Sequence, residues 1–333
     1  MINTWMVRAG RNGYLFDRFK ELSIVALGWD GVGSERDVSD KTALCSKLKI
    51  FYPDATEQSI LVAASQLVRF AHEVKVGDRV ATYDPRARIY QCGVIKGPCE
   101  YHPSVDEPTE LTNRRMVEWG QEKARDDLSP SARNSLGATL TLFSISTSIS
   151  SELWSERPLI LSDSSVIVKD SDATFDPSAI ELSELADEKI KDRIARLDEY
   201  SMQDLVAGLL RAMGYKTIVS ARGGDRGKDI VASPDGFGFQ TPRIVVEVKH
   251  RPREKMGSQA IRSFIGGRKP HESGLYVSTG GFTREAYYEA ERSNVPLTLL
   301  DFEELVRAVL SAYARFDESA RKLIPLTPVY WPL

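Results

Sequence analysis

Between residues 244 and 249 the chain reads Ile244-Val245-Val246-Glu247-Val248-Lys249. The apolar residues of this run are β-branched, which is typical of a buried strand. Successive side chains of a strand point to opposite faces, so Glu247 and Lys249 share one face of the predicted sheet. An unpaired buried charge is costly, so an acid and a base in this apolar strand need a reason. A structural salt bridge is one such reason, and a catalytic site is another.

An aspartate begins a second short strand upstream, Asp229-Ile230-Val231-Ala232, after a Gly-rich turn at residues 222–227. If the two strands are neighbours, Asp229 and Glu247 converge and repel each other. A divalent cation removes this repulsion, and Mg²⁺ prefers such hard oxygen ligands. The main-chain carbonyl of Val248 is a further candidate ligand. The pattern therefore predicts a Mg²⁺ site, in which Mn²⁺ can substitute, that activates a water for attack on phosphorus, with Lys249 orienting or activating that water.

The C-terminal part of the chain shows a regular succession of periodic segments. An amphipathic helix is predicted over 199–213 and stops at Gly214. Strands and helices then alternate, with Asp301 as the cap of a last helix. The order predicts an α/β fold, a mixed sheet flanked by helices. The predicted strands are 215–220, 229–232, 243–249, 274–278 and 296–300, and the helices that follow the third, fourth and fifth are 259–268, 283–293 and 301–310.

The first 150 residues predict a separate α+β domain. Short β-branched and aromatic runs indicate strands, and a stripe at residues 60, 63, 64, 67 and 70 indicates an amphipathic helix over 59–72. Residues 151–180, which are acidic and rich in Ser, Asp and Pro, are expected to be a linker. The predicted organisation is therefore a domain at 1–150, a linker at 151–180 and a second domain at 181–320. The strands expected in the first domain are 4–8, 24–27, 79–83, 89–95, 116–119 and 139–145.

Composition limits the class of protein. The chain has 333 residues, of which 42% are hydrophobic and 27% charged, the balance of a globular protein. No apolar run reaches the roughly 18 residues of a membrane span. Three cysteines without metal-ligand spacing are typical of a reducing compartment, so we expect a cytoplasmic protein without membrane contact. The net charge is −3, yet residues 243–269 hold eight basic and two acidic side chains, which indicates a local basic face.

Several segments of the C-terminal half together resemble the catalytic domain of Mrr-type restriction endonucleases, which belong to the PD-(D/E)xK superfamily. The resemblance covers residues 199–310. It implies an αβββαβ core and Mg²⁺-dependent cleavage of double-stranded DNA, with metal-binding roles for Asp229 and Glu247 and a water-activating role for Lys249. Many relatives have Gln at the position of Glu247. Glu is the better ligand for the metal. The resemblance also assigns a catalytic position to Gln203, where relatives often have Glu, and this weaker ligand puts a second metal in doubt. The matching segments are 203–207, 210–215, 224–230, 246–250 and 277–283.

Polar residues around the predicted site are candidates for DNA contacts. Arg251, Arg253 and Lys255 directly follow the strand that carries Glu247, where phosphate contacts and a solvated loop are both possible readings. Gln259, on the next predicted helix, is expected to support the site. Asp225 in the Gly-rich turn is expected to stabilise the turn.

The first domain is expected to select the DNA. Its motifs resemble PUA-like domains of the EVE kind, which implies a small curved β-barrel with a pocket for a flipped base. Trp29 is the first candidate for the wall on which that base stacks. Tyr101 and Trp119 are weaker candidates, and core packing is the alternative role for each of the three aromatic residues. The motifs stand at residues 25–29, 76–80, 90–97 and 114–119.

These features lead to the hypothesis of a type IV-like endonuclease that restricts foreign DNA with modified bases and serves in antiviral defence. Cutting both strands requires two sites, so a homodimer or higher homo-oligomer is expected. One alternative is a defence nuclease that is triggered by a nucleotide or phage signal in the first domain, and another is a non-catalytic DNA-binding protein. No pattern for binding ATP, NAD or zinc is present. The sequence leaves the modification, the cleavage position and the oligomeric state open.

Overall fold

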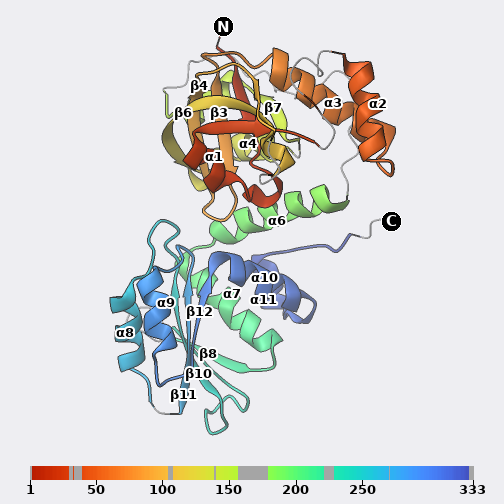
Figure 1. Ribbon diagram of the computed structural model, residues 1–333. Coiled ribbons are helices and arrows are strands. Elements are labelled where there is room, and N and C mark those ends of the chain that lie inside the picture. Colours follow the sequence, from red (N-terminus) through yellow and green to blue (C-terminus); the bar gives the residue numbers. More distant parts are fainter. Residues whose placement is uncertain are drawn as a thin grey trace. The chain divides into compact units, whose positions relative to one another are not determined.

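The computed structural model describes residues 2–29, 33, 40–103, 108–138, 140–156, 179–220, 229–269 and 271–329 (Figure 1). The chain divides into two compact units, Met1–Glu188 and Lys189–Leu333. The division falls inside helix α6 (Ala179–Ala195). The predicted linker at 151–180 therefore begins too early, because α5 (Thr147–Leu153) still packs in the first unit through buried Leu153. Residues 157–178 of that linker lie outside the described residues, as do Asp225 and the turn at 222–227.

The first unit is built on one curled, half-barrel-like sheet (Figure 1). Its strand order is β2-β6-β4-β3-β1-β7, with β5 paired to β6. Strands β1 and β3 run parallel, and the other pairs are antiparallel. The sequence therefore predicted most strands, but it missed that residues 116–119 belong to a longer strand. The strands are β1 (Thr4–Val7), β2 (Ile24–Leu27), β3 (Arg79–Asp84), β4 (Ile89–Ile95), β5 (Glu100–Tyr101), β6 (Asn113–Ala124) and β7 (Leu142–Ile145).

Helices α1 (Phe16–Leu22), α2 (Lys41–Phe51) and α3 (Glu57–His72) complete the main core of this unit. The predicted apolar stripe of α3 is buried, as its helical spacing indicated. Buried Asp78 holds the turn before β3, because its carboxylate accepts hydrogen bonds from the Trp5 indole (2.9 Å) and from two main-chain N–H groups. Helix α4 (Pro130–Leu136) packs with α5 in a smaller cluster.

The second unit contains a five-stranded mixed sheet in the order β12-β11-β10-β9-β8. Strand β9 is antiparallel to β8 and β10, and β10, β11 and β12 run parallel. The predicted order of elements and the mixed α/β sheet are confirmed. The elements are α7 (Glu199–Ala212), β8 (Lys216–Val219), β9 (Ile230–Ser233), β10 (Arg243–Lys249), α8 (Ser258–Gly266), β11 (Glu272–Ser278), α9 (Arg284–Glu291), β12 (Leu297–Asp301), α10 (Phe302–Ala312) and α11 (Glu318–Leu323).

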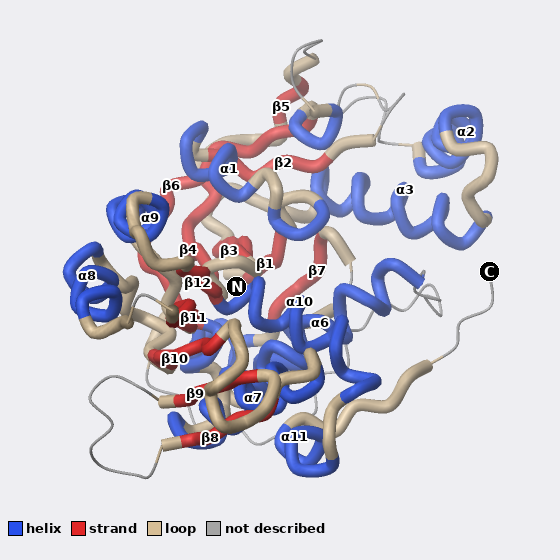
Figure 2. Tube along the Cα trace, turned by 90° about the horizontal axis from the view of Figure 1, so that it is seen from below, coloured by secondary structure: helices blue, strands red, loops and turns tan. Residues whose placement is uncertain are grey.

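Side chains alternate between the two faces of the sheet, and each face is covered by a different layer of helices. Val246, Val248 and Val277 point into the cluster that contains α7 and α10. Tyr276, one residue out of phase, points into the cluster that contains α8 and α9. Figures 1 and 2 both show α8 and α9 on one side of the sheet and α7 on the other. Glu247 and Lys249 share the phase of Tyr276, because β10 and β11 are parallel and Glu247 pairs with Tyr276.

Local signals fix the ends of the helices that frame the sheet. Gly214 follows α7 with a φ of +99°, a conformation that favours glycine. The predicted cap at Asp301 is confirmed, and Glu304 completes a capping box. None of the helices in the described part of the chain is long and apolar enough to cross a membrane.

Candidate active site

Asp229 is fixed beside Glu247 by two hydrogen bonds. Its main-chain N–H donates to the carbonyl of Val246 (2.9 Å), and its carboxylate Oδ2 accepts from the N–H of Val248 (2.6 Å). Val246 and Val248 are the two neighbours of Glu247 on β10. Asp229 therefore stands against Glu247 just before β9 begins, with only 4% of its surface exposed.

Glu247 and Lys249 form an ion pair on their common face of β10. The Lys249 Nζ lies 2.9 Å from Glu247 Oε1, and the side chains are 27% and 13% exposed respectively. The salt bridge that the sequence left open is therefore present. It does not stand alone, because a third charged group, Asp229, is bonded to the same short segment of strand.

The charges of this group act on one another. Burial lowers the pKa of the Lys249 ammonium, but the hydrogen bond and charge of Glu247, followed by the charge of Asp229, outweigh burial and raise the pKa above its ordinary value. Lys249 is thus protonated at neutral pH. Burial raises the pKa of the Tyr276 hydroxyl, and the charges of Glu247 and Asp229 raise it further. Both carboxylates therefore act on the same two groups, as expected if they converge.

Tyr276 was not identified from the sequence. Its ring makes edge contacts with Phe264 (centroids 5.2 Å apart) and Phe282 (5.9 Å) and is almost fully buried. It lies next to Glu247 only because β10 and β11 pair in that register. The register between two strands whose paired residues lie 29 positions apart leaves no local signal in the sequence.

The donors at this place fit a hard cation. Asp229 and Glu247 offer carboxylate oxygens. The N–H of Val248 points toward Asp229, so its carbonyl points to the same side of β10. Two carboxylates and one carbonyl match Mg²⁺, which keeps several of its waters. No cluster of three or more His, Cys, Asp or Glu side chains with metal-binding geometry occurs among the described residues, so a cage built only from side chains is not offered there.

The segment after β11 holds the end of β10 in place. The N–H of Thr279 donates to the carbonyl of Lys249 (3.0 Å), and the Thr279 hydroxyl lies 3.1 Å from His250 Nδ1. At Gly280 a Cβ would lie 2.2 Å from the carbonyl oxygen of Glu254 and 2.3 Å from that of Arg251. The motif at residues 277–283 therefore positions the loop that follows Lys249, and only glycine allows this close approach.

The predicted DNA-binding residues are exposed on this loop and the helix after it. Arg251, Arg253, Lys255 and Gln259 are all accessible. Arg251 is paired with Glu254 (3.1 Å) and lies close enough to Lys249 for its charge to lower the pKa of that amine. Contacts of these residues with phosphate stay a prediction.

Gln203 lies on helix α7. It is buried on α7, which packs on the face of the sheet that carries Val246 and Val248, whereas Glu247 and Lys249 belong to the other face. Within the described ranges, no hydrogen bond joins Gln203 to Asp229, Glu247 or Lys249. A catalytic role for Gln203 therefore stays a prediction.

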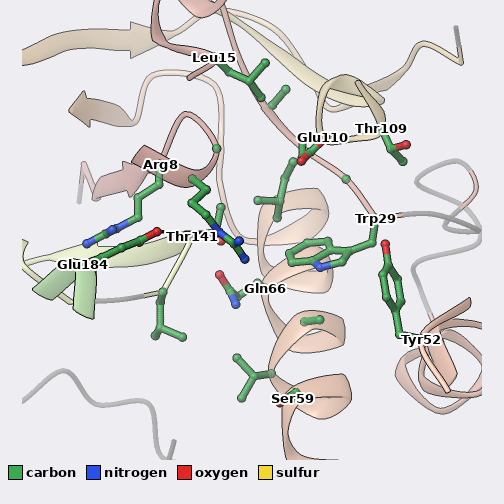
Figure 3. A pocket seen from close by; sticks show the side chains of 18 residues that line it. Arg8, Leu15, Trp29, Tyr52, Ser59, Gln66, Thr109, Glu110, Thr141 and Glu184 are labelled. Atoms are coloured by element: carbon green, nitrogen blue, oxygen red, sulfur yellow. Dashed lines mark ion pairs between the residues drawn. The ribbon is translucent and has the colours of Figure 1, made fainter. Parts of the chain in front are cut away.

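The first unit contains a cavity of about 730 Å³ (Figure 3). Trp29, at the end of β2, forms part of its wall together with Tyr52, and Gln66 faces it from α3. The Gln66 Oε1 accepts the main-chain N–H of Leu142 (2.8 Å), so its Nε2 is the group left for a ligand. Arg8 also lines the cavity, and its buried Nε has no hydrogen-bond partner.

Neither Tyr101 nor Trp119 belongs to the wall of this cavity. Trp119 packs against the core, and its indole N–H donates to the carbonyl of Phe19 (3.1 Å). Tyr101 is exposed on β5. A contact of either residue with a base stays a prediction, and it finds no support in the lining of this cavity. Sequence reasoning missed Tyr52 and Gln66, although a glutamine inside the apolar stripe of α3 was an available signal.

Comparisons with known proteins match the two units to two different families. Residues 194–309 match a family described as restriction endonuclease (Mrr_cat). Residues 5–146 match a family described as a domain of unknown function (DUF8426), so the PUA-like character of the first unit stays a prediction. No curated protein matches the chain.

Two solved structures resemble parts of the chain. One is described as MspJI restriction endonuclease in complex with a 27-mer oligonucleotide, with 12% identity, a TM-score of 0.32, and 79% of this chain and 69% of that chain covered. The other is described as the DNA modification-dependent restriction endonuclease AspBHI, with 17% identity, a TM-score of 0.32, and 74% and 67% covered. Likenesses at this TM-score are too weak to support a conclusion about this chain.

The family match and the geometry of β10 agree on the class of the second unit. Residues 194–309 form a restriction endonuclease domain, as the resemblance of residues 199–310 indicated. The chain that carries this domain is a deoxyribonuclease.

Proposed function

We propose that the chain is a Mg²⁺-dependent DNA endonuclease that restricts foreign DNA carrying modified bases. The observation that supports its chemistry best is the position of Asp229, which is hydrogen-bonded to both neighbours of Glu247 while Lys249 is paired with Glu247. An ordinary surface salt bridge does not require a third, buried carboxylate. This argues against a non-catalytic DNA-binding protein.

The residues divide the work between them. Asp229, Glu247 and the carbonyl of Val248 would hold the ion. When bound, Mg²⁺ polarises a phosphoryl oxygen and lowers the pKa of a coordinated water. Lys249 supplies a fixed positive charge and N–H donors that orient the water and stabilise the charge developing on the phosphate. The raised pKa of Lys249 keeps its amine protonated in the metal-free structure, so in this proposal it acts as a cation.

The cavity of the first unit supports selection of a modified base. Trp29 and Tyr52 offer aromatic surface, and Gln66 Nε2 offers a donor to the polar edge of a ligand. Flipping a base costs a few kcal/mol, and stacking on an aromatic side chain offsets about 1–3 kcal/mol of it. The cavity therefore has the groups that a flipped base requires.

The size of the same cavity favours a second candidate, a nuclease triggered by a free nucleotide. Its volume of about 730 Å³ lies within the roughly 300–1,000 Å³ of sites that enclose whole small molecules. Arg8 and Arg11, both on its wall, would suit a phosphate. In either case cleavage of both DNA strands requires two copies of Asp229, Glu247 and Lys249, so we propose a homodimer or larger homo-oligomer.

One cleavage experiment separates these possibilities. Supercoiled plasmids that are unmodified, or that carry methylcytosine, hydroxymethylcytosine, glucosylated cytosine, methyladenine or phosphorothioate, are incubated with the purified chain and Mg²⁺, Mn²⁺ or EDTA. We expect cutting of at least one modified plasmid, sparing of the unmodified one, and no cutting in EDTA. Cutting of unmodified plasmid only after nucleotides are added would favour the second candidate. Equal cutting of every plasmid without additions would contradict both.

A further inference from the structure

The last turn of α2 exposes two adjacent large apolar side chains. Ile50 is 77% exposed and Phe51 is 54% exposed. The buried side of α2 is formed by Leu44 and Leu48, so neither residue contributes to the contact of this helix with the core. Single exposed apolar residues are ordinary, so this pair carries an argument only together with its position and the charge of its helix.

The pair stands next to the cavity. Tyr52, the residue after Phe51, lines the cavity together with Trp29 (Figure 3). The turn that follows α2 is fixed, because Lys49 Nζ donates to the carbonyl of Ala55 (2.8 Å) and Tyr52 N–H donates to the carbonyl of Leu48 (2.9 Å). Ile50 and Phe51 are thus held beside the cavity wall by ordered backbone.

The charge of α2 fits a polyanion. Between Lys41 and Phe51 the helix carries Lys41, Lys47 and Lys49 and no acidic side chain. Asp40 caps the opposite end of the helix. Lysines on the same helix as an apolar pair favour a partner with negative charge outside and apolar surface inside, which is the make-up of a DNA duplex with its phosphates and stacked bases.

We propose that Ile50 and Phe51 form a wedge that enters the base stack of a DNA duplex where a base has left the stack for the cavity. This inference rests on the proposed function of the cavity as a reader of flipped bases. Apolar side chains that insert between base steps are a known way to stabilise an opened duplex. The lysines of α2 hold the neighbouring phosphates, and Trp29 and Tyr52 hold the extruded base.

A wedge should affect the binding of paired and mispaired DNA differently, whereas a simple contact surface should affect both equally. In a fully paired duplex, unpairing and unstacking must be compensated, and the wedge contributes to this. A mispaired base has already lost part of its pairing energy, so its extrusion depends less on the wedge. The wedge is therefore expected to matter for paired DNA and to matter little for the same base in a mispair.

The test uses the full-length chain in EDTA, so that DNA is bound and not cut. Fluorescent duplexes carry one modified base, taken in turn from methylcytosine, hydroxymethylcytosine, glucosylated cytosine and methyladenine, either correctly paired or mispaired, and dissociation constants are measured by anisotropy. The variants are Ile50→Ser combined with Phe51→Ser, Trp29→Ala, and Val76→Ser as a matched control, since Val76 is 59% exposed and does not line the cavity. Circular dichroism checks that each variant is folded.

We expect the double variant to bind the paired duplex about tenfold or more weakly and the mispaired duplex within about twofold of the unsubstituted chain. Trp29→Ala should weaken both duplexes, and Val76→Ser neither. Unchanged binding by the double variant overturns the wedge but leaves the reader intact. Equal loss on both duplexes overturns the wedge in favour of a general DNA contact. Two results would contradict the proposed reader, and with it the wedge. The first is that the unsubstituted chain binds no modified duplex better than unmodified DNA. The second is that Trp29→Ala binds modified duplexes as tightly as the unsubstituted chain does.

Discussion

Lys249 links the charge distribution of the site to its chemistry. Period two in β10 predicted that Lys249 and Glu247 share a face, and their contact at 2.9 Å agrees with it. The pKa of the amine could not be predicted in the same way, because burial opposes the raising effect of Glu247, and Asp229, 20 residues upstream, adds to that effect. The sequence therefore predicted which residues meet, and the structure adds that the surrounding charges favour the protonated form of Lys249 in the metal-free chain.

The first prediction concerns the role of this cation. Lys249→Ala should lower the cleavage rate by about a hundredfold or more, because a positioned donor to a developing charge is lost. Lys249→Arg should retain more activity than Lys249→Ala. In the metal-free structure the pKa of Lys249 is raised above its ordinary 10.5, which predicts a constant charge between pH 6 and 9. The ratio of rates for the original chain and Lys249→Arg should therefore be flat over this range in single-turnover cleavage assays. A ratio that climbs with pH would show that Lys249 acts as a base.

At the scale of elements, the ends of strands and the loops between them build the site. The segments 243–249 and 274–278 were identified as strands from residue type alone, but their register was not predictable, because pairing is a contact between distant segments. The same holds for the cavity. Trp29 could be singled out by its place after a strand, whereas Tyr52 and Gln66 reach the same wall only through the packing of α2 and α3. The role of Gln203 stays a prediction, since helical position alone does not reveal which face of the sheet a helix covers.

The second prediction concerns the contact between the loops after β10 and β11. Gly280→Ala places a methyl group on the carbonyls of Arg251 and Glu254 and should cost about 1–3 kcal/mol of unfolding free energy. Cleavage should also slow, because the displaced loop begins directly after Lys249. Gly257→Ala is the matched control, as a Cβ there meets no atom within 4 Å. Urea unfolding and cleavage rates of the two variants provide the measurement, and equal stability would contradict the close contact.

The third prediction concerns the loop between β9 and β10. Partial desolvation raises the pKa of Asp235, but hydrogen bonds from the N–H groups of residues 237–239 and the Ser233 hydroxyl lower it to about 2. A lowered pKa in the folded state means that the stabilising effect is present above the ordinary value near 3.8 and lost as pH falls toward 2. Asp235→Asn should therefore be less stable than the original chain at pH 6. The difference in urea midpoint should shrink between pH 4 and pH 2, and a difference independent of pH would refute this.

At the scale of the whole molecule, the chain joins a unit with a cavity to a unit with a nuclease site. The sequence predicted two domains and placed the nuclease correctly, because the motifs at Asp229 and Glu247 are local and specific. It placed the start of the second domain less well, since α6 is one continuous helix and its alternating charges give no sign that a division falls inside it.

The fourth prediction follows from one such site per chain. If two copies must cooperate, conversion of supercoiled plasmid to linear DNA should depend more steeply on protein concentration than nicking does. Adding excess Asp229→Asn chain should shift the product from linear to nicked circles, because mixed assemblies contain one active site. Agarose gel analysis of the products tests this. Linear DNA that forms at the same rate in the presence of the variant would rule out cooperation between copies.

The most direct measurement compares two aspartates at opposite ends of the β9–β10 pair. Asp229→Asn replaces one of the two carboxylates proposed to bind the metal, while Asp235→Asn makes the same change in the distant loop. In Mg²⁺, cleavage of modified plasmid by Asp229→Asn should fall by about a hundredfold or more, and cleavage by Asp235→Asn should stay near that of the original chain. A fully active Asp229→Asn chain, folded to the same extent, would contradict the assignment of the nuclease site.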